Sequence, residues 1–103
     1  MNYTKNNRML AVFKSLSNTN RLKILRLIYF SPKRLLNVGE IYEKMEIAQP
    51  TISDHLKLLR LNKIIRAKQH GSYMFYSIAD PLALELIGRM DNDTKLFRLK
   101  IRK

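Results

Sequence analysis

The predicted fold depends on one stretch, Gln49-Pro50-Thr51-Ile52-Ser53-Asp54-His55-Leu56-Lys57-Leu58-Leu59-Arg60-Leu61. Its apolar residues Ile52, Leu56 and Leu59 recur at i, i+4 and i+7, the spacing of one buried face of an α-helix. Most polar residues fall outside that face, with short hydrogen-bonding groups near the start and cations further along. Two interpretations fit such a face. It is either a solvated surface or a surface that places polar groups against DNA bases and cations against phosphates.

A short helix is predicted directly before this stretch. Asn37 followed three positions later by Glu40 is the pattern of a capping box, and the helix would bury Val38, Ile41 and Met45. The segment 48–50 makes a tight connection, since proline is favoured in the first turn of the next helix. Two helices joined by so short a turn are typical of a helix-turn-helix unit, whose second helix enters the DNA major groove.

The sequence changes period after the stretch. Residues 64–68 and 73–78 are rich in strand-forming residues and flank a turn at residues 69–72. A lone hairpin is marginally stable, so this one must pack on the helices, and Tyr73, Phe75 and Tyr76 are expected to do so. Asp80 and Pro81 then provide an N-cap and a first-turn proline for a last helix.

Two more helices are predicted at the N-terminal end, separated by the polar break at residues 17–20. Residues at helical spacing mark one face of each, Met9, Val12, Phe13 and Leu16 in the first and Leu22, Leu25, Ile28 and Tyr29 in the second. The second helix should stop near Pro32. The predicted fold is therefore mainly α with a small β-hairpin, in the order α-α-α-α-β-β-α of a winged helix-turn-helix.

The charge of the chain points to a polyanionic partner. The net charge is +12, and residues 1–34 contain eight Lys and Arg but no Asp or Glu. Nucleic acid or an anionic membrane surface would suit this balance. Among the basic residues of this N-terminal part, Arg21, Lys23 and Arg26 form either a solvated face or a set of phosphate contacts. The chain has no cysteine, which excludes disulfides and thiolate metal sites, and no apolar run near the ~18 residues of a membrane span. With no signal peptide visible either, we expect a cytoplasmic protein.

Three stretches, Phe13–Leu25, Gln49–Leu59 and Gly71–Ile78, resemble the ArsR/SmtB transcriptional repressors. The resemblance covers roughly residues 9–90. It implies a homodimer joined by the first and last helices, which binds an inverted-repeat operator with the fourth helix in the major groove. The hairpin would be a wing that reaches the flanking minor groove or backbone. The chain then divides into a DNA-binding and dimerisation domain at residues 1–94 and a basic tail at residues 95–103.

The resemblance also implies specific contact residues. DNA contacts are expected from Gln49, Pro50, Thr51, Ser53, Asp54, Lys57 and Arg60 on the recognition helix and from Arg66, Lys68 and His70 on the wing. Dimer contacts are expected from Met9, Val12, Phe13, Leu82, Leu86 and Met90. Pro50 and Asp54 depart from the residues common in the family. Asp54 either accepts a hydrogen bond from a cytosine amino group or holds Lys57 or Arg60 in place one turn away.

The sensing chemistry of the family is the larger departure. Many members bind metal through cysteines near the third helix or through Asp and His pairs on the last helix. Here Asp80 and Asp93 stand at roughly matching places, but Leu82 and Leu96 stand where the histidines would be. Carboxylates without imidazole or thiolate make a poor transition-metal site. We therefore expect no metal and no cofactor, and the inducer stays unknown.

The leading hypothesis is a sequence-specific double-stranded DNA-binding regulator, a repressor that occupies its operator as a homodimer. One alternative is a nonspecific or architectural nucleic-acid-binding protein that uses the same basic surfaces. Another is a protein that binds membrane surfaces through the tail. An enzyme is not expected, because the sequence shows no nucleophile–base pair, no glycine-rich phosphate loop and no cluster of carboxylates with histidine.

Overall fold

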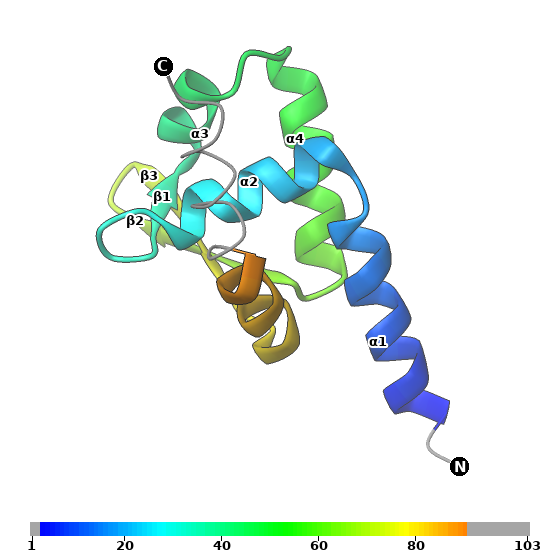
Figure 1. Cartoon of the computed structure of the whole chain (residues 1–103). Coiled ribbons are helices and arrows are strands. Elements are labelled where there is room, and N and C mark those ends of the chain that lie inside the picture. Colours follow the sequence, from blue (N-terminus) through cyan, green and yellow to red (C-terminus); the bar gives the residue numbers. More distant parts are fainter. Residues whose placement is uncertain (1–2, 91–103) are drawn as a thin grey trace, which may run out of the picture.

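The computed structural model describes residues 3–90, with side chains from residue 7 onward (Figure 1). In chain order the elements are α1 (Tyr3–Leu16), α2 (Thr19–Tyr29), β1 (Leu36–Asn37), α3 (Val38–Lys44), α4 (Gln49–Leu61), β2 (Ile65–His70) and β3 (Tyr73–Ile78). A further helix, called here the C-terminal helix, occupies residues 81–90. This order matches the predicted winged helix-turn-helix, with one short strand added. The predicted domain end at residue 94 and the basic tail lie outside the described residues.

One hydrophobic core joins these elements. Its buried apolar residues are Val12, Ile24, Leu25, Ile28, Leu36, Ile41, Met45, Ile52, Leu56, Leu59, Ile64, Ile65, Ala83 and Ile87. Helix α2 lies centrally and packs against α1, α4 and β3 (Figure 1). The predicted stripe Ile52, Leu56 and Leu59 is at most 3% exposed, and each such side chain contributes about 2 kcal/mol on burial. The core therefore fixes which face of α4 is left to solvent.

The predicted helix starts are confirmed by their caps. The Asn37 side chain accepts from the Glu40 backbone N–H at 2.8 Å, and the Glu40 carboxylate accepts from the Asn37 N–H at 2.9 Å. This reciprocal pair is the capping box, and it begins α3. Asp80 likewise accepts from the backbone N–H of Ala83 at 2.9 Å, at the start of the C-terminal helix.

The sheet has three antiparallel strands in the order β1-β3-β2, whereas the sequence predicted two. In the added pair, Leu36 lies opposite Tyr76. Two-residue strands carry no periodic signal, which is why β1 was missed. The first wing strand also ends later than predicted, at residue 70 and not 68, since His70 pairs with Tyr73 and the loop shrinks to residues 71–72. Gly71 at the first loop position has a φ of 63°, as in type II′ hairpin turns.

The apolar faces of the first two helices differ from the prediction. In α1, Val12 is fully buried, but Met9 and Phe13 are 41% and 47% exposed. Figure 1 shows the N-terminal end of α1 projecting away from the other elements. In α2 the fully buried face contains Ile24, not Leu22. Helical spacing identified both helices but did not tell which apolar residues meet the core of a single chain.

Candidate nucleic-acid interface

Helix α4 presents a continuous polar surface to solvent. All seven of its candidate contact residues are exposed: Gln49, Pro50, Thr51, Ser53, Asp54, Lys57 and Arg60. The short polar groups lie in the first turns and the two cations in the second half. This distribution places hydrogen-bonding groups where a helix entering a major groove meets base edges, and charge where it passes the phosphates.

A hydrogen bond links the two helices of the helix-turn-helix unit. The hydroxyls of Tyr42 on α3 and Ser53 on α4 lie 2.8 Å apart. A hydroxyl has one donor and two acceptor positions, so Ser53 keeps capacity for up to two further partners. Sequence reasoning placed Ser53 at the DNA but missed Tyr42, because nothing in the local pattern pairs residues on two different helices.

The second half of α4 lies close to the sheet. Burial raises the pKa of the Tyr76 phenol on β3, and the nearby Tyr42 raises it further, whereas the positive charge of Arg60 opposes the shift. The phenol is therefore neutral at physiological pH. Arg60 therefore lies close enough to Tyr76 for its charge to act on the phenol.

The wing gathers three candidate contact residues on one face. Arg66, Lys68 and His70 alternate along β2 and are all exposed. Their partners across the hairpin include Phe75 opposite Lys68, and the His70 ring meets the edge of Phe75 with centroids 6.4 Å apart. Phe75 packs the hairpin as expected. Tyr73 does not, because it is 60% exposed beside the turn. Its ring is an added surface group at the wing tip.

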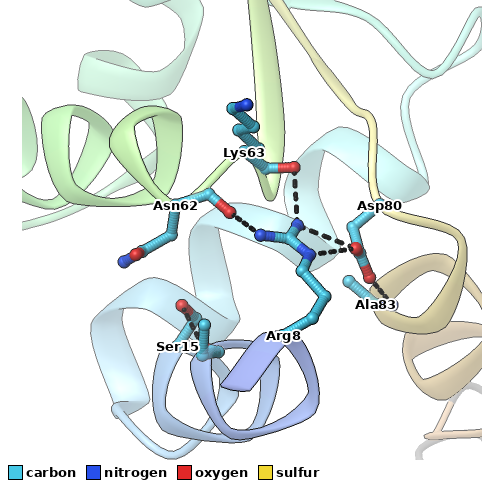
Figure 2. A network of polar contacts seen from close by, with 7 residues as sticks. Arg8, Ser15, Asn62, Lys63, Asp80 and Ala83 are labelled. Carbon is cyan, nitrogen blue, oxygen red and sulfur yellow. Dashed lines mark hydrogen bonds and ion pairs between the residues drawn. The ribbon is translucent and has the colours of Figure 1, made fainter. Parts of the chain in front are cut away.

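Arg8 joins α1 to the end of α4 and to the C-terminal helix, as Figure 2 shows. Its guanidinium donates to Oδ1 of Asp80 from Nε at 3.0 Å and from Nη2 at 2.8 Å. It also donates to the carbonyl oxygens of Asn62 and Lys63, the latter at 3.0 Å. The Asp80 side chain is 7% exposed. The network fixes the recognition helix relative to α1. No local pattern in the sequence indicates this network, because the partners lie 54 to 72 residues from Arg8.

The Arg8 network also engages the carboxylate of Asp80, which the resemblance placed near a metal site of the family. Oδ1 of Asp80 faces Arg8, and Oδ2 accepts from the Ala83 N–H. Within residues 3–90, no three His, Cys, Asp or Glu side chains group closely enough to hold a metal ion. Asp93 and Leu96 lie outside the described residues. Nor is any helix of this part long and apolar enough to cross a membrane.

The three basic residues of α2 differ in their contacts and in their burial. Arg21 donates to the carbonyl oxygens of Ser15 at 3.1 Å and Lys14 at 3.0 Å, so its guanidinium caps the end of α1. These contacts show that Arg21 is more than part of a solvated face, and its contact with phosphate stays a prediction. Lys23 is exposed, while Arg26 is half-buried. Spacing along the helix did not distinguish the three.

The candidate dimer residues fall into three groups. Met9 and Phe13 are exposed on α1, next to Leu10, which is 57% exposed. Leu82, Leu86 and Met90 on the C-terminal helix are partly buried against the core. Val12 corrects the prediction, because it is fully buried inside one chain and has no surface left for a partner.

Comparisons with known proteins agree with this arrangement. Residues 16–66 match a family model described as a helix-turn-helix domain. An uncharacterised HTH-type transcriptional regulator of Methanocaldococcus jannaschii is 34% identical over 80 residues, which cover 78% of this chain and 88% of the relative. The transcriptional repressor SdpR of Bacillus subtilis is 32% identical over 80% of this chain and 96% of its own length.

Solved structures show the same fold. The transcriptional repressor PagR of Bacillus anthracis superposes with a TM-score of 0.77 at 27% identity, covering 85% of this chain and 98% of that protein. HlyU of Vibrio cholerae superposes with a TM-score of 0.75 over the full length of both chains at 21% identity, a likeness of fold alone. A curated HlyU from that species is named a transcriptional activator and is 27% identical over 77% of this chain and 73% of its own.

Proposed function

Because the chain belongs to the ArsR/SmtB family of winged helix-turn-helix transcriptional regulators, we propose that it represses transcription by binding an inverted-repeat operator as a homodimer. It is a DNA-binding transcriptional regulator, not an enzyme. The observation that carries the proposal is α4, whose apolar face is held in the core while its polar face is exposed on a chain of net charge +12. Such a protein would act in the cytoplasm, where bacterial and archaeal DNA lies.

The contacts divide by chemistry. Gln49 and Thr51 would reach base edges from the first turn of α4, while Lys57 and Arg60 would meet phosphates. Ser53 would use the hydrogen-bonding capacity that Tyr42 leaves open. On the wing, Arg66, Lys68 and His70 would contact the flanking backbone or minor groove. This assignment is supported by the exposure of all ten residues, including Pro50 and Asp54.

The homodimer is supported by the exposed apolar face of α1. Met9, Leu10 and Phe13 are each more than 40% exposed. Leu10 also lines a hollow with Leu58 of α4, itself 40% exposed. A second copy of the chain would cover these side chains and place two copies of α4 for two half-sites. Repression is the proposed outcome because SdpR and PagR carry that name.

Selection of duplexes from a random DNA library tests the proposal directly. We expect an inverted repeat whose half-sites lie about one helical turn, or a multiple of it, apart. Affinity for that sequence should exceed affinity for bulk DNA by ~10³ or more. A reporter with the repeat placed over its promoter should be silenced. Duplexes recovered without any shared sequence would support the architectural alternative instead.

We expect the cations of the wing to add affinity through phosphate contacts and to contribute little to the preference for one DNA sequence. Replacing Arg66 and Lys68 together with Gln removes four phosphate contacts from a dimer. The slope of log affinity against log salt should then fall by roughly 3 to 4, because each contact contributes about 0.9. Affinity should drop at every salt concentration, while the preferred sequence stays the same. Filter binding or fluorescence anisotropy between about 50 and 200 mM salt measures the slope.

A matched control removes the same charge elsewhere. Lys33 is exposed in the loop after α2, and Arg89 is exposed on the C-terminal helix in a weak pair with Glu85 at 3.2 Å. The Lys33→Gln, Arg89→Gln variant should keep a slope close to that of the unaltered protein. An equal loss of slope in both variants would mean that the protein's overall charge drives binding, not the wing.

A further inference from the structure

A groove with a volume of about 690 Å³ lies between α2 and α3. This volume is within the range of small-molecule sites, about 300 to 1,000 Å³. Its walls come from the second half of α2, the loop that follows it and α3. None of the ten candidate DNA contacts lines it. It is therefore a separate surface from the one assigned to DNA.

The groove combines an apolar floor with a cationic rim. Leu36 and Met45, at 4% and 6% exposed, form part of the floor, and Phe30, 43% exposed, forms one side. The charged residues at the rim are Lys23, Arg26, Glu40 and Lys44. The only carboxylate among them, that of Glu40, already accepts from the Asn37 backbone N–H in the capping box. Three cations are thus opposed by a single, partly engaged acid.

Arg26 marks where an acceptor is missing. Its Nε atom is buried and has no hydrogen-bond partner among the described residues. Its guanidinium carbon lies 5.8 Å from the centre of the Phe30 ring, a contact that orients the group but satisfies no N–H. Buried donors are nearly always paired in folded proteins. Arg26 lines the groove, so an anionic acceptor bound there would meet its guanidinium, and a turn of the side chain would bring the buried Nε within reach of the acceptor.

We propose that this groove binds an organic anion that carries a carboxylate on an apolar body. The carboxylate would meet Arg26, with Lys23 and Lys44 adding charge. The hydrocarbon or aromatic body would cover Leu36 and Met45. A DNA phosphate would use the rim cations but leave the apolar floor in water. The chain's own basic tail, residues 95–103, has the wrong charge for the rim.

The position of the groove also suggests a consequence for DNA binding, which rests on the proposed function. An occupant would touch α2 and α3 together, and α3 is joined to α4 by residues 45–48. A ligand that favours one arrangement of these helices shifts the population that binds DNA. The binding site itself does not depend on this consequence.

Titration of the full chain with 4-phenylbutyrate, followed by amide NMR shifts, tests the site without DNA. We expect saturable shifts at residues 23–45. The neutral 4-phenylbutanol and inorganic phosphate should each bind at least about tenfold more weakly, since each lacks one half of the recognition. Equal binding of the alcohol, or of phosphate, would overturn the proposal, because the groove would then select only for apolar character or only for charge.

The variant Arg26→Met separates a ligand role from a structural one. Affinity for 4-phenylbutyrate should fall about tenfold or more, while the melting temperature holds or rises, because the unpaired buried donor is gone. Arg89→Met, which removes an exposed guanidinium, should leave the affinity unchanged. A lower melting temperature for Arg26→Met with unchanged ligand affinity would show a structural residue and reject the site. In operator assays, 4-phenylbutyrate at the concentration that half-saturates the unaltered protein should alter the operator affinity of that protein and have much less effect on Arg26→Met.

Discussion

Replacing Asp80 with Ala is expected to lower the free energy of unfolding by about 3 to 5 kcal/mol, because it leaves the partly buried Arg8 without its counter-charge. The carboxylate is 7% exposed, and both of its oxygens are engaged, one by Arg8 and one by the Ala83 N–H. Loss of that cap is part of the same effect, since N-caps alone contribute about 1 kcal/mol. The lower end of the range applies, because the Arg8 side chain is 36% exposed and water screens it.

Thermal denaturation followed by circular dichroism measures this effect. In a domain of this size each kcal/mol shifts the melting temperature by about 4 to 8 °C, so a fall of more than about 10 °C is expected. The control is Glu85→Ala, which removes a carboxylate from an exposed pair and should cost less than about 1 kcal/mol. If the two variants melted alike, the Arg8 network would not stabilise the fold.

A double-mutant cycle isolates the ion pair from the cap. Arg8→Met keeps the apolar stem and removes the guanidinium from Asp80 and from the carbonyls of Asn62 and Lys63. The double variant Arg8→Met, Asp80→Asn should lose less free energy of unfolding than the sum of the two single variants. Each single change leaves one charged partner unpaired, whereas the double change leaves none. Strict additivity would show that Arg8 and Asp80 stabilise the protein independently.

The elements with local signals were the ones that the sequence could predict. The stripe Ile52, Leu56 and Leu59 lies within one helix, and the capping box of α3 spans four residues. Both follow from short-range geometry, so α3, α4 and the wing were found close to their true bounds. Strand β1 was missed because its pairing with β3 joins residues about 40 positions apart and needs only two of them.

The exposed face of the candidate interface could be predicted from the sequence, but the role of each cation could not. The exposed face of α4 followed from its buried stripe. The roles of individual cations did not follow from the charge count, because a backbone carbonyl can bind a guanidinium as well as a phosphate can. Arg21 caps α1 through the carbonyls of Lys14 and Ser15, and Arg8 holds the end of α4. Those acceptors are set by tertiary structure alone.

Helix α1 was ambiguous for a physical reason. Its apolar residues are spaced for one continuous face, and the same spacing serves a core or a subunit interface. In the single chain that face divides, with Val12 fully buried and Phe13 47% exposed. Large exposed apolar side chains on a helix that extends from the body are typical of a surface covered by a partner. This division leads to the strongest test of the proposed assembly.

Replacing Phe13 with Glu is expected to convert the dimer to a folded monomer. The new carboxylate would be buried in an apolar interface without a partner, at a cost that a modest interface does not offset. Folding should be retained because the side chain is already about half exposed in one chain. Sedimentation equilibrium should report the monomer mass, and circular dichroism should report an unchanged helix content.

The loss of operator affinity should be large because two tethered copies of α4 act together. Once one copy is bound, the other is held near its half-site at high effective concentration, an advantage of about 10² to 10⁴ in affinity. Phe13→Glu should therefore weaken binding to the inverted repeat by ~100-fold or more, while binding to an isolated half-site changes little. Leu35→Glu is the control, because Leu35 is a 40% exposed apolar residue outside α1 and its variant should stay dimeric. A Phe13→Glu protein that remained dimeric would place the interface elsewhere, on Leu82 and Leu86 of the C-terminal helix.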